Sequence, residues 1–179
     1  KVPVFSFEKL SGLDTQLGPE MKSTGEVLGI GRTLMEALYK GLVAANYRME
    51  KGGGVFITVR NSDKGEMVDT ARKFYESGFT LYATKGTARA LFNAGMDVTT
   101  VPKISEGDGL MELLESGKIQ YVISTSKKGR LPARDSVKIR RKAVERAIPC
   151  LTSMDTANAL IDSLNSRYSQ QTMELVNIN

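Results

Sequence analysis

The stretch that decides the fold is Val55-Phe56-Ile57-Thr58-Val59, an apolar and β-branched run of the kind that forms a buried strand. Asn61-Ser62-Asp63 follows and predicts the start of a helix, with Glu66 as the partner of Asp63 in a capping box. Gly78 is expected to end this helix. Its apolar face is expected to consist of Met67, Val68, Ala71, Phe74 and Tyr75.

The same alternation continues along the chain. Further strands are predicted at residues 79–83, 96–101, 120–123 and 147–151. Further helices are predicted at residues 87–94, 108–117, 136–146 and 153–164, and Asp108 is expected to cap the second of these. Together the sequence predicts an α/β fold, a three-layer αβα domain with a five-stranded parallel sheet and right-handed crossovers.

Residues 1–50 do not join this alternation. Thr33 begins a predicted helix with Glu36 as its capping partner and with Leu34, Ala37, Leu38, Leu42 and Ala45 as its apolar set. Residues 46–54 resemble a linker that is loosest at its three glycines. We therefore expect an incoming segment with a linker (1–50), an αβα domain (51–165) and a polar tail (166–179). The start, without an initiator Met or a signal peptide, suggests a piece of a longer protein.

Composition narrows the classes of function. The 179 residues contain no histidine and one cysteine, Cys150, so the commonest general base is missing and a zinc site is disfavoured. We expect no metal site and no catalytic residue in this chain. No apolar run approaches the roughly 20 residues of a membrane helix, and a single cysteine suggests a reducing compartment, the cytoplasm. The net charge of +5 suits nucleic acid or small anionic ligands such as phosphate esters.

Polar residues follow every predicted strand of the sheet. Because ligands of open α/β sheets bind beyond the carboxyl ends of the strands, these residues are the candidate site. Helix N-termini, hydroxyls and ammonium groups together predict a cup for a phosphate, with Gly86 allowing close approach of the backbone. Taken alone, any one of the hydroxyls is better explained as an ordinary helix cap, and Thr84-Lys85-Gly86-Thr87 is the exception. The candidates are Lys64; Thr84, Lys85, Gly86 and Thr87; Lys103; Ser124, Thr125 and Ser126; and Thr152.

Two other features of the sequence have a simple structural interpretation. Asp108 could be a catalytic base, but a helix cap is the simpler interpretation. A basic group could form a nucleic-acid face, but no aromatic residues are interleaved with it and a solvated helix face is the default, so nucleic acid is not expected. Its members are Lys127, Lys128, Arg130, Arg134, Lys138, Arg140, Arg141 and Lys142.

Two stretches resemble one family. Residues 17–33 (LGPEMKSTGEVLGIGRT) look like the end of the second ATP-grasp domain of the carbamoyl-phosphate synthetase large subunit. Asp63-Lys64, Ala83-Thr84-Lys85-Gly86-Thr87 and Lys103-Ile104-Ser105-Glu106-Gly107 resemble the allosteric domain that ends the same polypeptide, which is of the methylglyoxal-synthase-like type. The two resemblances fall in the family's order and cover nearly the whole chain.

The resemblance implies a regulatory module of a ligase that makes carbamoyl phosphate from bicarbonate, ammonia and ATP, with Mg or Mn, for pyrimidine and arginine synthesis. Its partners would be the rest of the large subunit and the glutaminase small subunit. UMP would inhibit, and IMP or phosphoribosyl pyrophosphate would activate. The family's phosphate positions match Lys64, Thr84, Thr87 and Lys103, and Ser124-Thr125-Ser126 would lie near the sugar and base. Thr152 matches a position associated with ornithine.

Several alternatives stay open. Methylglyoxal synthase is similar in fold and phosphate cup, and Asp108 matches its catalytic aspartate, but the absence of histidine argues against that activity. The module could also be a ligand-free assembly surface. The sequence leaves undecided which effector binds, the sign of its effect and whether the chain forms a homo-oligomer.

Overall fold

The five predicted strands form one parallel sheet in the computed structural model, which describes residues 1–6, 19–125, 135–166 and 168. The strands lie in the order β5-β4-β3-β6-β7 and every neighbouring pair is parallel, as predicted. The chain therefore builds outward from β3 to β5 and then continues on the other side of β3. The strand bounds are β3 (Gly54–Thr58), β4 (Thr80–Thr84), β5 (Val98–Val101), β6 (Ile119–Ser124) and β7 (Cys150–Leu151).

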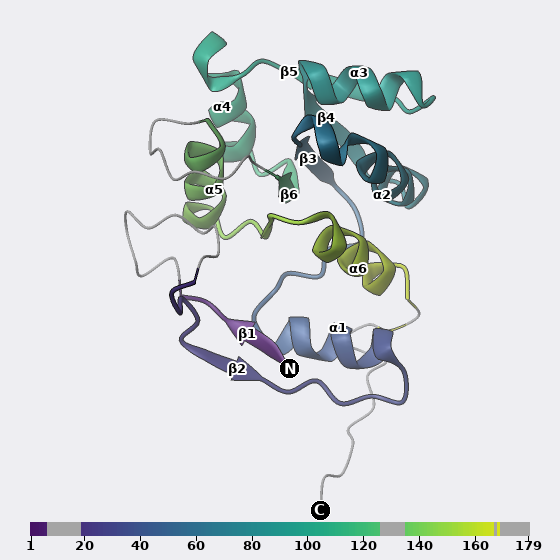
Figure 1. Ribbon diagram of the computed structural model, residues 1–179, viewed down its shortest axis with the longest axis vertical. Helices are drawn as coiled ribbons and strands as arrows, with labels where there is room; N and C mark the ends of the chain where they lie inside the picture. Colours follow the sequence, from purple (N-terminus) through teal and green to yellow (C-terminus); the bar gives the residue numbers. More distant parts are fainter. Residues whose placement is uncertain (7–18, 126–134, 167, 169–179) are drawn as a thin grey trace, which may run out of the picture.

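Helices cover both faces of this sheet, which confirms the three-layer αβα fold (Figure 1). One layer contains α2, α3 and α6, and the other contains α4 and α5. The helix bounds are α2 (Lys64–Glu76), α3 (Lys85–Asn93), α4 (Gly109–Glu115), α5 (Asp135–Glu145) and α6 (Met154–Leu164). Among the described helices, none is long and apolar enough to cross a membrane.

Alternation along the strands divides the interior into two cores. On β3, Val55 and Ile57 point to the layer that contains α2, whereas Phe56 points to the layer that contains α4 and α5. All three side chains are fully buried. Burial of each such side chain stabilises the fold by about 1.5–3 kcal/mol. With a strand on either side and helices on both faces, β3 is the central strand of the structure.

Two expected helix caps are wrong. Asp63 and Asp108 occupy the N-cap positions of α2 and α4, but neither side chain accepts a hydrogen bond from its helix. Both have helical backbone angles (φ −96°, ψ 0° and φ −84°, ψ −7°), whereas a capping side chain needs an extended backbone to reach back. Asp63 is the last residue of a 3₁₀ turn, η2 (Asn61–Asp63), which accounts for its helical angles. A second 3₁₀ turn, η3 (Ile104–Glu106), is separated from Asp108 by Gly107, which has φ +149°. Tyr75, expected on the apolar face of α2, is 36% exposed.

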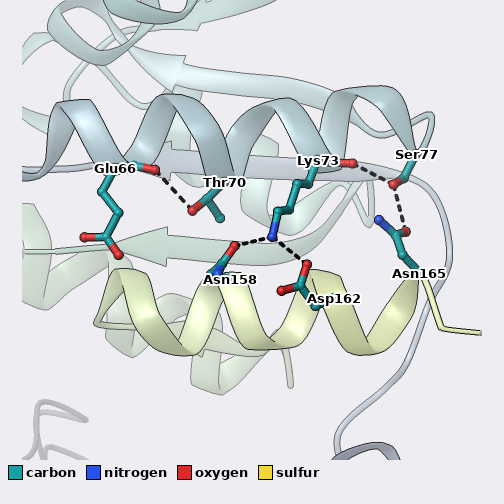
Figure 2. A network of polar contacts seen from close by, with 7 residues as sticks. All are labelled: Glu66, Thr70, Lys73, Ser77, Asn158, Asp162 and Asn165. Carbon is teal, nitrogen blue, oxygen red and sulfur yellow. Dashed lines mark hydrogen bonds and ion pairs between the residues drawn. The ribbon is translucent and has the colours of Figure 1, made fainter. Parts of the chain in front are cut away.

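Helices α2 and α6 lie side by side and share a network of polar contacts (Figure 2). The Lys73 ammonium donates to Asn158 Oδ1 at 2.8 Å and to Asp162 Oδ1 at 2.6 Å. At the end of α2, the Ser77 hydroxyl lies 2.8 Å from Asn165 Oδ1. These contacts, added to the apolar packing beneath them, fix the direction of α2 and hence the position of Lys64 at its first turn.

The segment before the sheet contains a helix and a small second sheet. Helix α1 (Leu34–Ala44) begins as predicted, because Thr33 Oγ1 accepts from the Glu36 N–H at 3.2 Å. Leu42 joins the main core, whereas Leu34 is 75% exposed and is not part of the apolar face as expected. Antiparallel strands β1 (Val2–Val4) and β2 (Gly25–Val27) were not predicted, since three residues give too short a pattern to detect.

Two of the three glycines at the entry to β3, Gly53 and Gly54, are closely packed rather than loose, whereas Gly52 has open space around it. Gly53 has φ +101°, and a Cβ at this residue would lie inside the Gln120 side chain. The Gly54 N–H lies 2.6 Å from Gln120 Oε1 and 2.9 Å from the Lys118 carbonyl oxygen. The buried Tyr121 hydroxyl reaches the carbonyls of Arg48 and Glu50 at 3.0 and 2.9 Å. Residues 46–54 are therefore attached to the sheet through the Gly54 N–H and through the carbonyls of Arg48 and Glu50.

Candidate functional site

The carboxyl ends of the strands are aligned along one edge of the sheet. Thr58 at the end of β3 pairs in register with Ser124 at the end of β6, and Thr84 at the end of β4 pairs with Val101 of β5. The chain leaves β3 at the point where β4 and β6 lie on either side of it. This reversal of strand order is where ligands of open α/β sheets bind.

On the β4 side, two threonines of the predicted phosphate motif are tied to the end of β3. Thr84 Oγ1 lies 3.2 Å from Thr58 Oγ1, and Thr87 Oγ1 accepts a hydrogen bond from the Val59 N–H at 3.4 Å. Both are buried, with exposed fractions of 9% for Thr84 and 2% for Thr87. Because Thr87 Oγ1 accepts from Val59, its own proton remains available to an anion.

Helix α3 begins at this point, and within the described residues no side chain caps its N-terminus. Thr84 is its N-cap residue, but the Thr84 side chain makes no capping hydrogen bond because the hydroxyl is directed to Thr58. No acidic residue lies in the first turn of α3. The backbone N–H groups of Lys85, Gly86 and Thr87 therefore keep both their hydrogen-bonding capacity and the positive end of the helix dipole.

Lys64 is brought to the same place from α2. A Cβ on Gly86 would lie 3.5 Å from the Lys64 ammonium, so the lysine reaches over the glycine at the first turn of α3. Lys64 is half-buried, whereas Lys85 is exposed. An ammonium group, free N–H groups and threonine hydroxyls that converge on one point favour binding of a phosphate or another small oxyanion.

On the β6 side, Thr125 joins the exits of β3 and β6. Its N–H donates to the Thr58 carbonyl at 3.1 Å, and its Oγ1 accepts from the Arg60 N–H at 3.2 Å. The Arg60 Nε lies 2.8 Å from both Asp63 carboxylate oxygens, and the Ser62 hydroxyl donates to Asp63 Oδ1 at 2.9 Å. Burial alone would raise the pKa of Asp63, but hydrogen bonds from Arg60, Thr125 and Ser62 outweigh it and lower the pKa below its ordinary value.

Ser124 is the unexplained polar group of this edge. Its residue is 1% exposed, and its hydroxyl has no hydrogen-bond partner among the described residues. A buried polar atom without a partner costs about 1–3 kcal/mol. The sequence singled out Ser124, and the structure places it beside Thr58 at the strand reversal.

The other predicted residues lie farther along the same edge. Lys103 is exposed and follows Val101, the register partner of Thr84. Thr152 is half-buried and follows Leu151, the partner of Ile123. Within the described ranges, no hydrogen bond joins Lys103 or Thr152 to the other site residues. Ser126 lies outside the described residues.

Sequence reasoning missed Thr58, Arg60 and the carboxylate role of Asp63. Thr58 was included only as part of a strand, and Asp63 was interpreted as a helix cap. The available signal was the spacing of Arg60 and Asp63, since a cation and a carboxylate three residues apart at a helix start can pair.

Residues 66–152 match the family model described as the MGS-like domain. These residues form an MGS-like domain. The match includes every predicted site residue except Lys64, which lies just before it together with Arg60 and Asp63. The observed α/β fold agrees with the match.

Two other kinds of site find little support around the MGS-like domain. In the part of the chain that the structure describes, no cluster of three or more acidic or cysteine side chains could hold a metal ion. On α5, Lys142 pairs with Glu115 at 3.0 Å, and Arg146 lies 3.4 Å from the same carboxylate. Arg140 is buried. Among the described members of the basic group, Lys142 is thus paired with a carboxylate and Arg140 is covered by the fold. Lys127, Lys128, Arg130 and Arg134 lie outside the described residues.

Proposed function

We propose that the MGS-like domain is a regulatory module that binds a nucleotide effector through its phosphate. The observation that supports this most strongly is the uncapped first turn of α3 with the Lys64 ammonium above Gly86. The match to the MGS-like domain is consistent with a regulatory module of this type.

In the proposed binding mode, the phosphate takes the N–H groups of residues 85–87, the hydroxyls of Thr84 and Thr87, and the ammonium of Lys64. Lys103 approaches from the end of β5 and adds a second positive charge. The sugar and base extend toward β6, where the buried Ser124 hydroxyl has no hydrogen-bond partner in the described part of the chain. Thr125 and Ser126 follow it, and Thr152 borders a separate position at the end of β7.

The parent protein in this proposal is the large subunit of the glutamine-dependent carbamoyl-phosphate synthetase, an ATP-dependent ligase of the cytoplasm that uses Mg or Mn. Residues 17–33 support this assignment through their resemblance to its ATP-grasp domain. UMP would inhibit, and IMP or phosphoribosyl pyrophosphate would activate. Binding would change the affinity of the catalytic domain for its substrates by a coupling free energy of about 1–3 kcal/mol.

The MGS-like domain itself performs no chemistry in this proposal. A phospho-lyase of the methylglyoxal synthase type remains compatible with the family match, and Asp108 is exposed and does not cap α4. The chain contains no histidine to serve beside it. A ligand-free assembly module would not account for the unpartnered Ser124 hydroxyl or the uncapped α3.

Isothermal titration calorimetry of this chain with UMP, IMP and phosphoribosyl pyrophosphate tests the proposal, with inorganic phosphate as competitor. Saturable binding of at least one nucleotide is expected. Lys64→Ala and Thr84→Ala should weaken it about tenfold or more, because each removes a direct donor to the phosphate.

Lys118→Ala is the matched control, since Lys118 is exposed and precedes β6 at the opposite edge of the sheet. Its affinity should equal that of the unmodified chain. Equal affinity in Lys64→Ala and Thr84→Ala as well would refute the placement of the site.

A further inference from the structure

We infer that Arg60 binds a second anionic group of the effector, and that it thereby selects effectors with phosphoryl groups at both ends of a sugar over those with one. This inference rests on the proposed function and adds a specificity-determining residue to it. It starts from a guanidinium that the structure holds in place while leaving most of its donors unused.

Arg60 is fixed from two sides. Its Nε lies 2.8 Å from both oxygens of Asp63, whose side chain is only 12% exposed, and its backbone N–H donates to Thr125 Oγ1 at 3.2 Å. Asp63 is held in turn by the Ser62 hydroxyl, and its low pKa keeps it charged at neutral pH. A side chain held in this way loses little further conformational freedom when it binds a ligand.

The two terminal nitrogens of the guanidinium have no partner within the described residues, and the Arg60 side chain is 45% exposed. An arginine that uses only Nε for an internal pair retains four N–H donors on these nitrogens. A planar fork of donors matches the oxygens of a phosphate, which it can bind with two hydrogen bonds at once.

The contacts of Arg60 and Lys64 lead to different neighbours of β3. Lys64 reaches to Gly86 on the β4 side, whereas the Arg60–Asp63 pair is attached to Thr125 on the β6 side. A ligand that spans from the first turn of α3 toward β6 therefore meets one cation at each end. The class of ligand that best fits two separated cations is a sugar bisphosphate or a sugar phosphate that carries a pyrophosphate.

The test compares two ligands that share the first phosphate. Ribose 5-phosphate carries one phosphoryl group, and phosphoribosyl pyrophosphate adds a pyrophosphate at the other end of the same sugar. Both are titrated into the full chain by calorimetry, with a chelator present so that no metal bridges the phosphates. We expect phosphoribosyl pyrophosphate to bind about tenfold or more tightly than ribose 5-phosphate.

Arg60→Gln should remove this preference and leave the affinity for ribose 5-phosphate within about twofold, since one charged donor pair is lost at the second phosphate only. Arg60→Lys should retain part of the preference, because it keeps the charge and loses the planar fork. Arg89→Gln is the matched control, as Arg89 is exposed on α3, and its removal should leave the preference intact.

Three results would overturn the inference. If the unmodified chain binds ribose 5-phosphate but does not prefer phosphoribosyl pyrophosphate, the role of Arg60 is overturned and the proposed function is not. An equal loss of affinity for both ligands in Arg60→Gln also overturns the role of Arg60, because Arg60 would then act on the shared phosphate or on the fold. Binding of neither ligand to the unmodified chain overturns the proposed function, and the role of Arg60 with it.

Discussion

Thr87 illustrates how one residue can support both the fold and a ligand. Its hydroxyl oxygen accepts a hydrogen bond from Val59, which joins the start of α3 to the end of β3. The hydroxyl proton is not used in that contact and can be donated to an oxyanion. Thr84 and Thr58 share one hydrogen bond, so one of their two protons also remains free. The donors of the candidate site are thus positioned by contacts that exist without a ligand.

A substitution at Gly86 is expected to weaken ligand binding while it raises the stability of the fold. A methyl group at this position would lie 3.5 Å from the Lys64 ammonium and would occupy the space proposed for the phosphate. The residue lies in the first turn of α3 without a positive φ. Gly86→Ala should therefore weaken effector binding about tenfold or more while raising the free energy of unfolding by up to about 1 kcal/mol. Calorimetry and urea denaturation measure the two quantities.

Gly65→Ala is the control for this variant. Gly65 lies in the first turn of α2, and a Cβ there would meet no atom within 4 Å. It should gain similar stability and keep full affinity. If Gly86→Ala also kept full affinity, the phosphate would have to lie away from the first turn of α3.

At the scale of elements, the five strands of the parallel sheet were predictable because each lies within a short run rich in apolar and β-branched residues between helix-forming stretches. The helix ends were less so. Asp63 and Asp108 have the residue type of a cap, but both have helical backbone angles that a capping side chain cannot use. Ser153, in an extended backbone, does cap α6 and accepts from the Thr156 N–H. Residue type alone does not distinguish the two cases.

The candidate site was predicted in part for a similar reason. Strand ends and glycine spacing indicate which residues reach the carboxyl edge, so Lys64, Thr84 and Thr87 were found. The contacts of Thr125 with Arg60 and with Thr58 depend on the neighbouring strand β6, which sequence periodicity does not place. Tertiary contacts of this kind are the part that sequence reasoning could not supply.

The entry into β3 provides a test at the element scale. Gly53 has φ +101°, and any side chain there would collide with Gln120. Gly53→Ala should lower the free energy of unfolding by about 1–3 kcal/mol, from backbone strain and displacement of Gln120. Thermal and urea denaturation measure this loss.

Gly52→Ala is the comparison, because a Cβ at Gly52 meets no atom within 4 Å. Its stability should change by less than about 0.5 kcal/mol. A loss of equal size in both variants would mean that residues 52–54 act through chain flexibility and not through close packing.

At the scale of the whole molecule, α1 and the sheet share one core. Leu42 of α1 belongs to the same cluster as Met67 of α2 and Leu160 of α6. Helix α2 also carries Lys64, and α6 is tied to α2 by the Lys73 network (Figure 2). A ligand that binds at the start of α2 is therefore connected through packed helices to the segment that precedes the MGS-like domain.

Leu42→Ala tests this continuity. The side chain is 8% exposed, and its truncation should lower the free energy of unfolding by about 2–4 kcal/mol in a single transition. Leu34→Ala, on the same helix but 75% exposed, should change it by less than about 0.5 kcal/mol. Two separate unfolding transitions, with only the first shifted by Leu42→Ala, would show that α1 folds independently of the sheet.

The most direct test of the central claim, a phosphate site at the carboxyl edge of the sheet, is to follow backbone amide NMR shifts while inorganic phosphate is added to the labelled chain. We predict saturable changes that are largest at the amides of Lys85, Gly86 and Thr87, with smaller changes at Lys64, and that are lost in Thr84→Ala. Largest changes on the basic face of α5, or none that saturate at the start of α3, would contradict the claim.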